Sequence, residues 1–213
     1  LYESTGLVGH STLRAEEPTT GKVVRTHDIP ADVFGEGLAL VGGTLIQLSW
    51  QEQRAFTYDE RTFEPGKEFT YSGEGWGLCH DGARLVMSNG SDKLTFRDPV
   101  TFDPTGEVAV TNAGRPLPML NELECVDGQV YANVWQTNEI VAIDPAGGAV
   151  TAMIDAAGLW EEMADRDPTL PIDVLNGIAY DPADKTFLVT GKLWPKLFRV
   201  RFVPAGATPT AAP

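Results

Sequence analysis

Four side chains with chemical potential recur at corresponding places in four similar segments of the sequence. They are Glu36, Trp76, Glu122 and Asn176, at intervals of 40, 46 and 54 residues, and Asn121 adjoins the third of them. A carboxyl group can transfer protons, whereas amide and indole N–H groups donate hydrogen bonds to developing negative charge. Brought together from separate segments, these groups would form a pocket for proton transfer on a polar substrate.

A second set of candidates stands near the turns of the same segments. Trp50 and Trp135 each precede a polar turn, and Lys192 lies in the corresponding turn of the last segment. With Trp76, the two tryptophans could form an aromatic box around a flat or cationic group. Taken singly, a tryptophan at a strand end more often packs between structural units, and a lone lysine is more often solvated.

The polar set also has a purely structural interpretation. In it, the sequence Gly35-Glu36-Gly37 is only a turn, and Asn121 and Asn176 cap backbone N–H groups that tie neighbouring segments together. A folding scaffold, however, needs no carboxylate and tryptophan at corresponding places. The set as a whole therefore favours a pocket.

Residues 117–145 show which elements must position these groups. Asp127-Gly128 is a tight-turn dipeptide between short apolar runs, residues 130–135 and 139–143 alternate in polarity, and Asp144-Pro145 ends the pattern. Alternation of this kind, with such turns, is typical of an antiparallel meander.

Four other segments align with this meander, the first of them only in part. Residues placed to form a fourth strand lie between successive units, at 23–27, 68–71, 107–111 and 149–154. A period of about 40 to 50 residues with four strands is the blade length of a β-propeller. The sequence therefore predicts an all-β, five-bladed propeller as a single domain over residues 1–203. Residues 158–164 predict one or two helical turns that Asp167-Pro168 ends, and the tail 204–213 is expected to be disordered.

Composition limits the classes of partner. A net charge of −14 and a pI near 4.5 argue against a nucleic-acid or anionic-membrane surface, because both require clustered Lys and Arg. No apolar run approaches the roughly 18 residues of a membrane span. His10, His27 and His80 lie at non-corresponding places and predict no metal site. Cys79 and Cys125 correspond in successive units and are expected to be free, buried thiols.

Several strings resemble the plant and bacterial type of glutaminyl-peptide cyclotransferase. The resemblance spans about residues 1–202 and rests on LYESTG, FGEGLAL, LNELE, YANVWQTNEIVAIDP, DVLNGIAYD and GKLWPKLFRV. It implies a five-bladed propeller that cyclises N-terminal glutaminyl residues of peptides to pyroglutamate, releases ammonia and uses no cofactor or catalytic metal. The family's catalytic residues fall on Glu36, Asn121 and Lys192. Its substrate-binding tryptophans fall on Trp50, Trp76 and Trp135.

One departure from the family concerns the first blade. Family members carry an upstream Phe-Thr-Gln-Gly-Leu motif in the first blade's inner strand, and this sequence lacks it. The outer strand that closes the family's ring is absent as well, so a truncated sequence is expected. The resemblance further suggests export to the periplasm or outside the cell, and a monomer is expected.

The residues fit the implied chemistry. Glu36 would take a proton from the substrate amine and return one to the leaving nitrogen, and Asn121 and Lys192 would stabilise the oxyanion. Glu122 and Asn176 are expected to support substrate binding. Two rival interpretations stay open: a calcium-dependent hydrolase or lactonase using Glu36, Asn121, Asn176 and Asp173, and a catalytically silent propeller that binds peptides.

Overall fold

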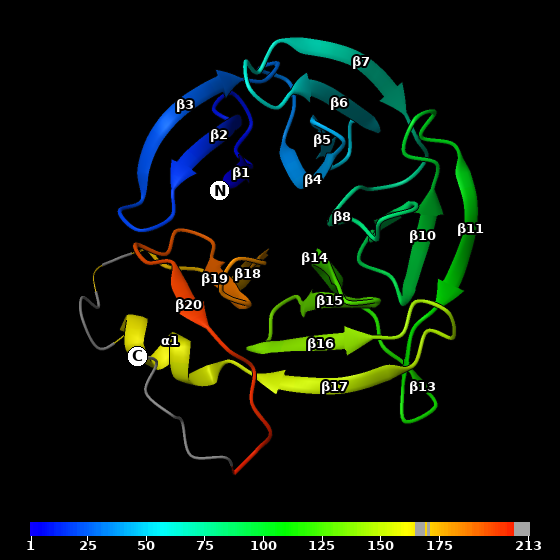
Figure 1. The fold of residues 1–213 in the computed structure, drawn as a ribbon, viewed down its shortest axis with the longest axis vertical. Coiled ribbons are helices and arrows are strands. Elements are labelled where there is room, and N and C mark those ends of the chain that lie inside the picture. The colour runs from blue at the N-terminus through cyan, green and yellow to red at the C-terminus, as the bar shows by residue number, and fades with distance from the viewer. Residues whose placement is uncertain (165–168, 170, 207–213) are drawn as a thin grey trace.

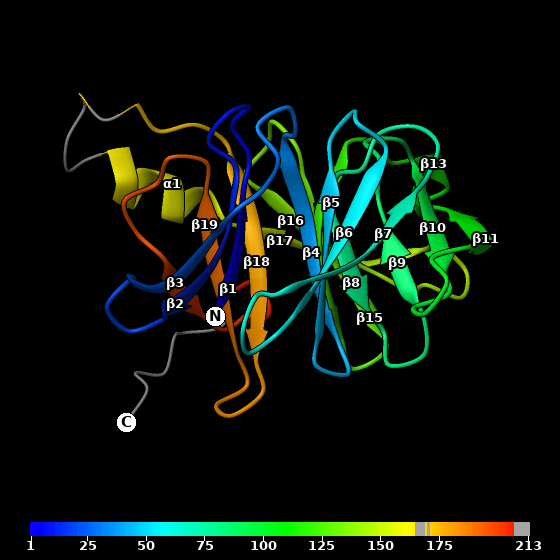
Figure 2. The same ribbon diagram turned by 90° about the horizontal axis from the view of Figure 1, so that it is seen from above.

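The computed structural model describes residues 1–164, 169 and 171–206 of the chain. Most of the tail predicted to be disordered therefore lies outside the described residues. The described strands form a ring of five antiparallel sheets around a common centre, which confirms the predicted all-β propeller (Figure 1). Viewed from the side, the ring is a disc, and the strands run between its two faces (Figure 2).

Each blade is a simple meander whose strands follow one another from the centre outward. The first blade contains β1 (Tyr2–Thr5), β2 (Thr12–Glu17) and β3 (Lys22–Asp28). The second contains β4 (Gly35–Val41), β5 (Thr44–Ser49), β6 (Arg54–Asp59) and β7 (Pro65–Thr70). The third contains β8 (Leu78–His80), β9 (Leu85–Met87), β10 (Lys93–Arg97) and β11 (Pro104–Ala109).

The remaining blades follow the same plan. The fourth contains β14 (Leu120–Val126), β15 (Gln129–Val134), β16 (Glu139–Ile143) and β17 (Val150–Asp155). The fifth contains β18 (Leu175–Asp181), β19 (Thr186–Gly191) and β20 (Phe198–Val200), and it lies beside the first blade. Between the third and fourth blades, β12 (Thr111–Asn112) and β13 (Arg115–Pro116) form a small hairpin. The sequence analysis missed this hairpin because strands of two residues have no detectable alternation.

The hydrophobic core is divided among the interfaces between neighbouring blades. Between the second and third blades, Leu48 and Ile46 pack with Leu78 and Leu85, all four almost completely buried. Between the third and fourth, Val86 packs with Leu123 and Val130. Because every blade buries its sheet faces against its neighbours, the inner strands are held rigidly relative to one another.

The expectation of free thiols was wrong. Cys79 on β8 and Cys125 on β14 form a disulfide between the inner strands of the third and fourth blades, with their Cα atoms 5.5 Å apart. The correspondence of the two residues in the repeat had been recognised. What it did not reveal is that the inner strands approach one another closely enough for a bond.

A short helix covers part of the fourth and fifth blades. α1 (Ala157–Ala164) confirms the predicted helical turns, and its Leu159, Trp160 and Met163 pack on the core of these blades. The predicted stop at Asp167-Pro168 lies outside the described residues. In the described part of the chain, no helix is long and apolar enough to cross a membrane.

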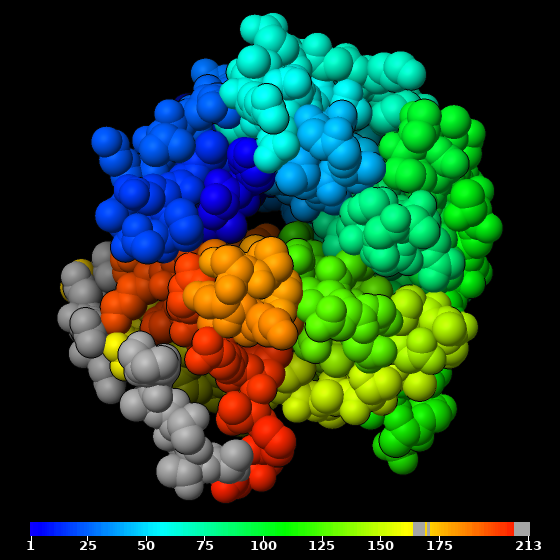
Figure 3. All heavy atoms as spheres, viewed as in Figure 1, coloured from blue at the N-terminus to red at the C-terminus, as the bar shows by residue number. Residues whose placement is uncertain are grey.

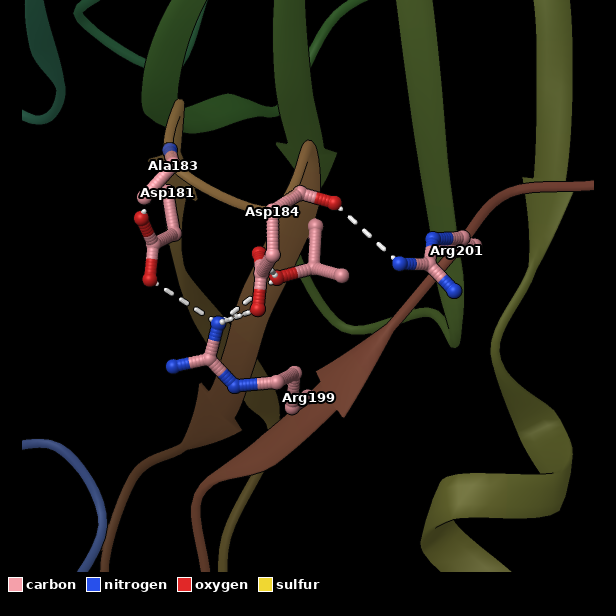
Figure 4. A network of polar contacts seen from close by, with 6 residues as sticks. Asp181, Ala183, Asp184, Arg199 and Arg201 are labelled. Atoms are coloured by element: carbon pink, nitrogen blue, oxygen red, sulfur yellow. Dashed lines mark hydrogen bonds and ion pairs between the residues drawn. The ribbon is translucent and has the colours of Figure 1, made fainter. Parts of the chain in front are cut away.

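At one face of the disc, the first and second strands of a blade are joined by tight turns whose polar groups are hydrogen-bonded. In the fifth blade, Arg199 Nη1 donates to Asp181 Oδ2 at 2.9 Å and to Asp184 Oδ2 at 2.7 Å, and Arg201 Nη2 donates to the carbonyl of Asp184 at 3.1 Å (Figure 4). These contacts tie the β18–β19 turn to the outer strand. We call this face the turn end of the inner strands and the opposite face the mouth end.

Candidate active site

Three inner strands are interrupted by a β-bulge at their mouth end. The pairing register shifts by one residue between Gly35 and Leu38, between Leu120 and Leu123, and between Leu175 and Ile178. The third blade has the same two-against-one geometry, because the Trp76 N–H and the Gly77 carbonyl both bond to Ser88. A bulge inserts one extra residue and redirects side chains. The candidate residues thus stand where the ladders are broken.

The register corrects the correspondence expected from the sequence. Leu38, Leu78, Leu123 and Ile178 pair with equivalent second-strand residues, so the bulge residues that correspond are Glu36, Trp76, Asn121 and Asn176. Asn121, and not Glu122, is therefore the counterpart of Glu36. Glu122 corresponds to Gly37, Gly77 and Gly177 in the other blades. The sequence placed Glu122 wrongly because an extra residue in a strand cannot be located without its partner strand.

The glycines at these places permit close approach between blades. A Cβ on Gly37 would lie 2.5 Å from the backbone nitrogen of Leu78, and one on Gly77 would lie 2.2 Å from the carbonyl oxygen of Asn121. The Gly37 N–H donates to the Trp76 carbonyl at 2.7 Å. Real side chains do not tolerate such distances. The inner strands of the second, third and fourth blades therefore meet directly at the mouth end.

The second strands supply another ring of side chains. The backbone N–H groups of Trp50, Trp135 and Lys192 each donate to a backbone carbonyl of their own blade, at 2.8–3.0 Å. The accepting residues all stand two places before the first bulge residue; they are Phe34, Met119 and Val174. The three residues are thus equivalent, as the sequence predicted for their turns. In the third blade Gly90 takes this place, and a Cβ there would lie 2.6 Å from the ring of Trp76. Trp76 therefore occupies the space that an equivalent side chain would fill.

The aromatic residues form two contacting pairs joined by one carboxylate. Trp76 and Trp135 pack edge to face with ring centres 5.4 Å apart, and Phe34 and Trp50 do so at 5.7 Å. Glu74 Oε2 accepts hydrogen bonds from the indole N–H groups of Trp50 and Trp76, both at 2.9 Å. The predicted tryptophan set is thus brought together.

Three charged residues of the mouth act on the carboxyl of Glu36. Burial raises the pKa of its carboxyl to about 8; the positive charge of Lys192 opposes this rise, and the negative charges of Glu74 and Glu52 add to it. Lys192 Nζ lies 6.0 Å from the ring centre of Phe34. Among the described residues none hydrogen-bonds the Glu36 carboxyl.

The carboxyls next to Glu36 are also perturbed. Burial raises the pKa of Glu122 well above its usual range, and the charges of Glu36 and Glu124 add to that rise. Burial raises the pKa of Glu124 to about 7. The charges of Glu36 on β4 and Glu124 on β14 thus both disfavour ionisation of Glu122.

The side chains of Asn121 and Asn176 differ in their hydrogen bonding. Asn176 Oδ1 accepts a hydrogen bond from the backbone N–H of Glu122 at 3.4 Å, so it links the fifth blade to the fourth. Asn121 is 4% exposed, and its Oδ1 has no hydrogen-bond partner among the described residues. A buried amide oxygen without a partner is costly, which is typical of a group reserved for a ligand. Asn121 therefore suits a binding role, and Asn176 suits a structural one.

The space-filling view looks onto the turn end of the disc, so the mouth end lies on the face turned away from the viewer (Figure 2, Figure 3). A hollow lies at the middle of the disc, between the blue segment around β1 and the orange segment around β18 (Figure 3). A separate cavity of about 220 Å³ lies against Tyr131, Phe187 and Arg201, near the turn end. Because none of the candidate residues lines that cavity, it belongs to another part of the molecule.

Comparisons with known proteins agree with this geometry. The sequence profile of the family described as glutamine cyclotransferase matches residues 1–202. The chain belongs to the glutamine cyclotransferase family. A curated relative, the glutaminyl-peptide cyclotransferase of Arabidopsis thaliana, is 40% identical over 208 residues, which are 97% of this chain and 65% of that protein. The chain thus spans just under two thirds of the length of this relative.

Solved structures give the same result. The glutaminyl cyclase of Myxococcus xanthus superposes with a TM-score of 0.87 at 42% identity, over 94% of this chain and 84% of that one. A nidogen/laminin complex matches with a TM-score of 0.58 at 12% identity, over 89% of this chain and 70% of that one. The second likeness shows the propeller fold alone.

The sequence analysis missed two acidic residues of this glutamine cyclotransferase mouth. Glu74 was not among the candidate residues, and Glu52 was considered only as part of the polar turn after Trp50. The Oε2 atom of Glu52 is buried and has no hydrogen-bond partner in the described residues. The sequence did contain a signal for Glu74. The residue two places before the bulge is apolar in the other blades, where it is Phe34, Met119 or Val174, and an acidic residue departs from that pattern.

Proposed function

We propose that this chain cyclises the N-terminal glutaminyl residue of peptides and proteins to pyroglutamate, with release of ammonia. The observation that supports this most directly is Glu36, a half-buried carboxyl whose pKa burial raises to about 8 against the opposing charge of Lys192. A peptide α-amino group has a pKa of about 7.7 to 8.0. Proton transfer between groups of matched pKa needs little driving force, which suits one carboxyl to act as both base and acid.

The reaction requires one proton to move between two nitrogens. The neutral α-amine attacks the γ-carboxamide carbon, and Glu36 accepts the proton that the amine nitrogen gives up as the new C–N bond forms. Glu36 then donates this proton to the former amide nitrogen as the old C–N bond breaks. Ammonia leaves, the lactam remains, and Glu36 is again ionised.

Lys192 and Asn121 act on the carbonyl oxygen of the substrate. During attack this oxygen gains negative charge, and preorganised donors stabilise it by about 3 to 4 kcal/mol each in the best-studied sites. Lys192 supplies a positive charge in the mouth, and the side-chain amide of Asn121 supplies N–H donors. The backbones of both residues are held in place, because the Lys192 N–H donates to the Val174 carbonyl and the Ser88 hydroxyl donates to the Asn121 carbonyl.

The tryptophans hold the substrate in a folded form. Trp50, Trp76 and Trp135 present flat apolar faces to a short side chain that must bring its amide carbon onto its own α-nitrogen. Restricting a reacting pair in this way can contribute several kcal/mol. The carboxyls of Glu36, Glu52 and Glu74 attract the ammonium form of the peptide N-terminus to the same mouth.

The wider setting of this activity is part of the proposal. All candidate residues come from one chain, so we take the acting unit to be a monomer without a cofactor. The Cys79–Cys125 disulfide supports action in an oxidising compartment, where such bonds persist.

Ammonia release from a glutaminyl dipeptide amide tests the proposal. The assay compares the chain with Glu36→Gln, with and without a chelator, and uses Glu64→Gln as a control that removes the same charge from an exposed site. We expect chelator-resistant turnover that falls at least a hundredfold in Glu36→Gln and is unchanged in Glu64→Gln.

Two other results would decide for the rival interpretations. Loss of turnover in chelator would favour a metal-dependent hydrolase, although among the described residues no group of three His, Cys, Asp or Glu side chains can hold a metal. Binding of the peptide without turnover, under all conditions, would favour a catalytically silent propeller.

A further inference from the structure

The carboxylate of Glu74 is the junction of the aromatic groups at the mouth. Its Oε2 accepts from two indoles, and its Oε1 accepts from Gln51 Nε2 at 2.9 Å. These bonds, led by the one from Trp76, lower the pKa of Glu74, so it is ionised near neutral pH. Through it the Phe34–Trp50 pair is connected to the Trp76–Trp135 pair.

The position of Glu74 in the fold is unusual for an acidic residue. The equivalent places before the other bulges hold Phe34, Met119 and Val174, whose carbonyls accept from the second strand of their blade. Blade geometry alone therefore requires no carboxylate here. The Gly75 N–H instead donates to the carbonyl of Trp50 at 2.9 Å. The segment that carries Glu74 is therefore bonded to the second blade at Trp50.

We propose that Glu74 is a positioning residue of this mouth: its carboxylate holds the indoles of Trp50 and Trp76 in the orientation in which they bind the glutaminyl side chain. The proposal rests on the proposed cyclisation. An indole can rotate about two side-chain torsions, and a single acceptor shared by two indole N–H groups fixes both rings at once. Substrate-binding faces supplied by different blades are thereby kept in one geometry.

Glu74 also contributes charge to the reacting carboxyl. Its negative charge raises the pKa of Glu36, together with that of Glu52, while Lys192 lowers it and burial is the largest cause. Glu122, on β14 of the fourth blade, is a further acidic group, and the charge of Glu36 raises its pKa. Two substitutions can therefore separate the two effects of Glu74, because one removes charge and the other removes reach.

Glu74→Gln keeps the shape but removes the charge, and Glu74→Asp keeps the charge but shortens the side chain by one methylene. For Glu74→Asp we expect KM to rise about tenfold, because one charge-assisted hydrogen bond is lost. The pH profile of kcat/KM should be unchanged, because the charge remains. For Glu74→Gln we expect the ascending limb of that profile to move to lower pH. Glu64→Gln serves as the control and should change neither quantity.

A double-mutant cycle tests whether Glu74 acts through the indoles. Trp50→Phe removes one indole N–H, so adding Glu74→Asp to it should cost clearly less in kcat/KM than Glu74→Asp costs alone. Fully additive losses, or a KM unchanged in Glu74→Asp, would overturn the proposal.

A readout without turnover keeps this proposal separate from the proposed function. The chain has five tryptophans, each of which gives one indole N–H resonance. In Glu74→Ala we expect two of these resonances to move upfield, because two indoles lose a carboxylate acceptor, and glutamine amide binding to weaken. If the chain releases no ammonia but the two resonances move and binding weakens, the positioning role stands and the cyclisation fails. Unmoved resonances would sink the positioning role by themselves.

Discussion

The two ends of the inner strands are built on opposite principles. At the turn end the ladders stay in register up to the last pair, as between Val126 and Gln129, and charged side chains satisfy one another, as around Arg199 (Figure 4). At the mouth end the ladders are bulged. There, Asn121 and Glu52 keep buried oxygens without partners among the described residues, and Glu36 has a raised pKa.

The difference shows that the mouth end is the less stable arrangement of the two. A regular turn contributes hydrogen bonds and nothing else, whereas a bulge loses a ladder bond but turns a chosen side chain toward the centre. Unsatisfied polar groups and strained charges persist only where the surrounding structure holds them. In this chain the tightly packed interfaces between blades provide that support.

The largest expected effect that separates the two ends comes from Lys192. In Lys192→Ala we expect kcat/KM to fall by about 10²- to 10³-fold, because an oxyanion donor is lost. Since the charge of Lys192 lowers the pKa of Glu36, the ascending limb of the pH profile should also move to higher pH. Lys196→Ala, which removes a nearby lysine paired with Glu162, is the matched control. A profile that stays in place in Lys192→Ala would contradict this electrostatic assignment.

A pair of glycine substitutions compares the ends directly. Gly77→Ala places a Cβ 2.2 Å from the Asn121 carbonyl and should lower the free energy of unfolding by about 3 kcal/mol and reduce ammonia release. Gly128→Ala meets no atom within 4 Å but has a φ of +78°, so about 1 kcal/mol is expected with activity intact. Denaturant unfolding and the ammonia assay measure both. Equal losses in the two variants would show that the mouth end is no more constrained than the turn end.

The last expected effect is a gain in stability without a gain in activity. The pKa of Glu36 is about 8 in the folded protein, above the value of an exposed glutamate, so the folded state binds the proton more tightly than the unfolded state does. Stability is therefore lost as pH rises from about 4.5 through 8. Glu36→Gln should melt at the same temperature as the parent chain near pH 4 and roughly 10–20 °C higher at pH 9. A lower melting temperature at pH 9 would argue that Glu36 is stabilising.

Local sequence patterns were sufficient for most of the fold. The alternation within 130–135 and 139–143 and the Asp127-Gly128 turn predicted β15, β16 and their connections, and the repeat extended the prediction to all five blades. The β12–β13 hairpin was beyond reach because its strands are too short. For the site, the sequence gathered the tryptophans, Glu36 and Lys192 at one face but did not include Glu74, since a hydrogen bond between different blades leaves no trace in spacing.

The sequence by itself determined which residues form strands, where the turns fall and that the unit repeats, because alternation and turn chemistry act over a few neighbouring residues. Only the tertiary structure decided three further matters. It made Asn121 the counterpart of Glu36, it joined Cys79 to Cys125, and it gave Glu74 two indoles to hold. Each of these depends on how closely one inner strand approaches the next, and that distance is set by the packing of whole blades against one another.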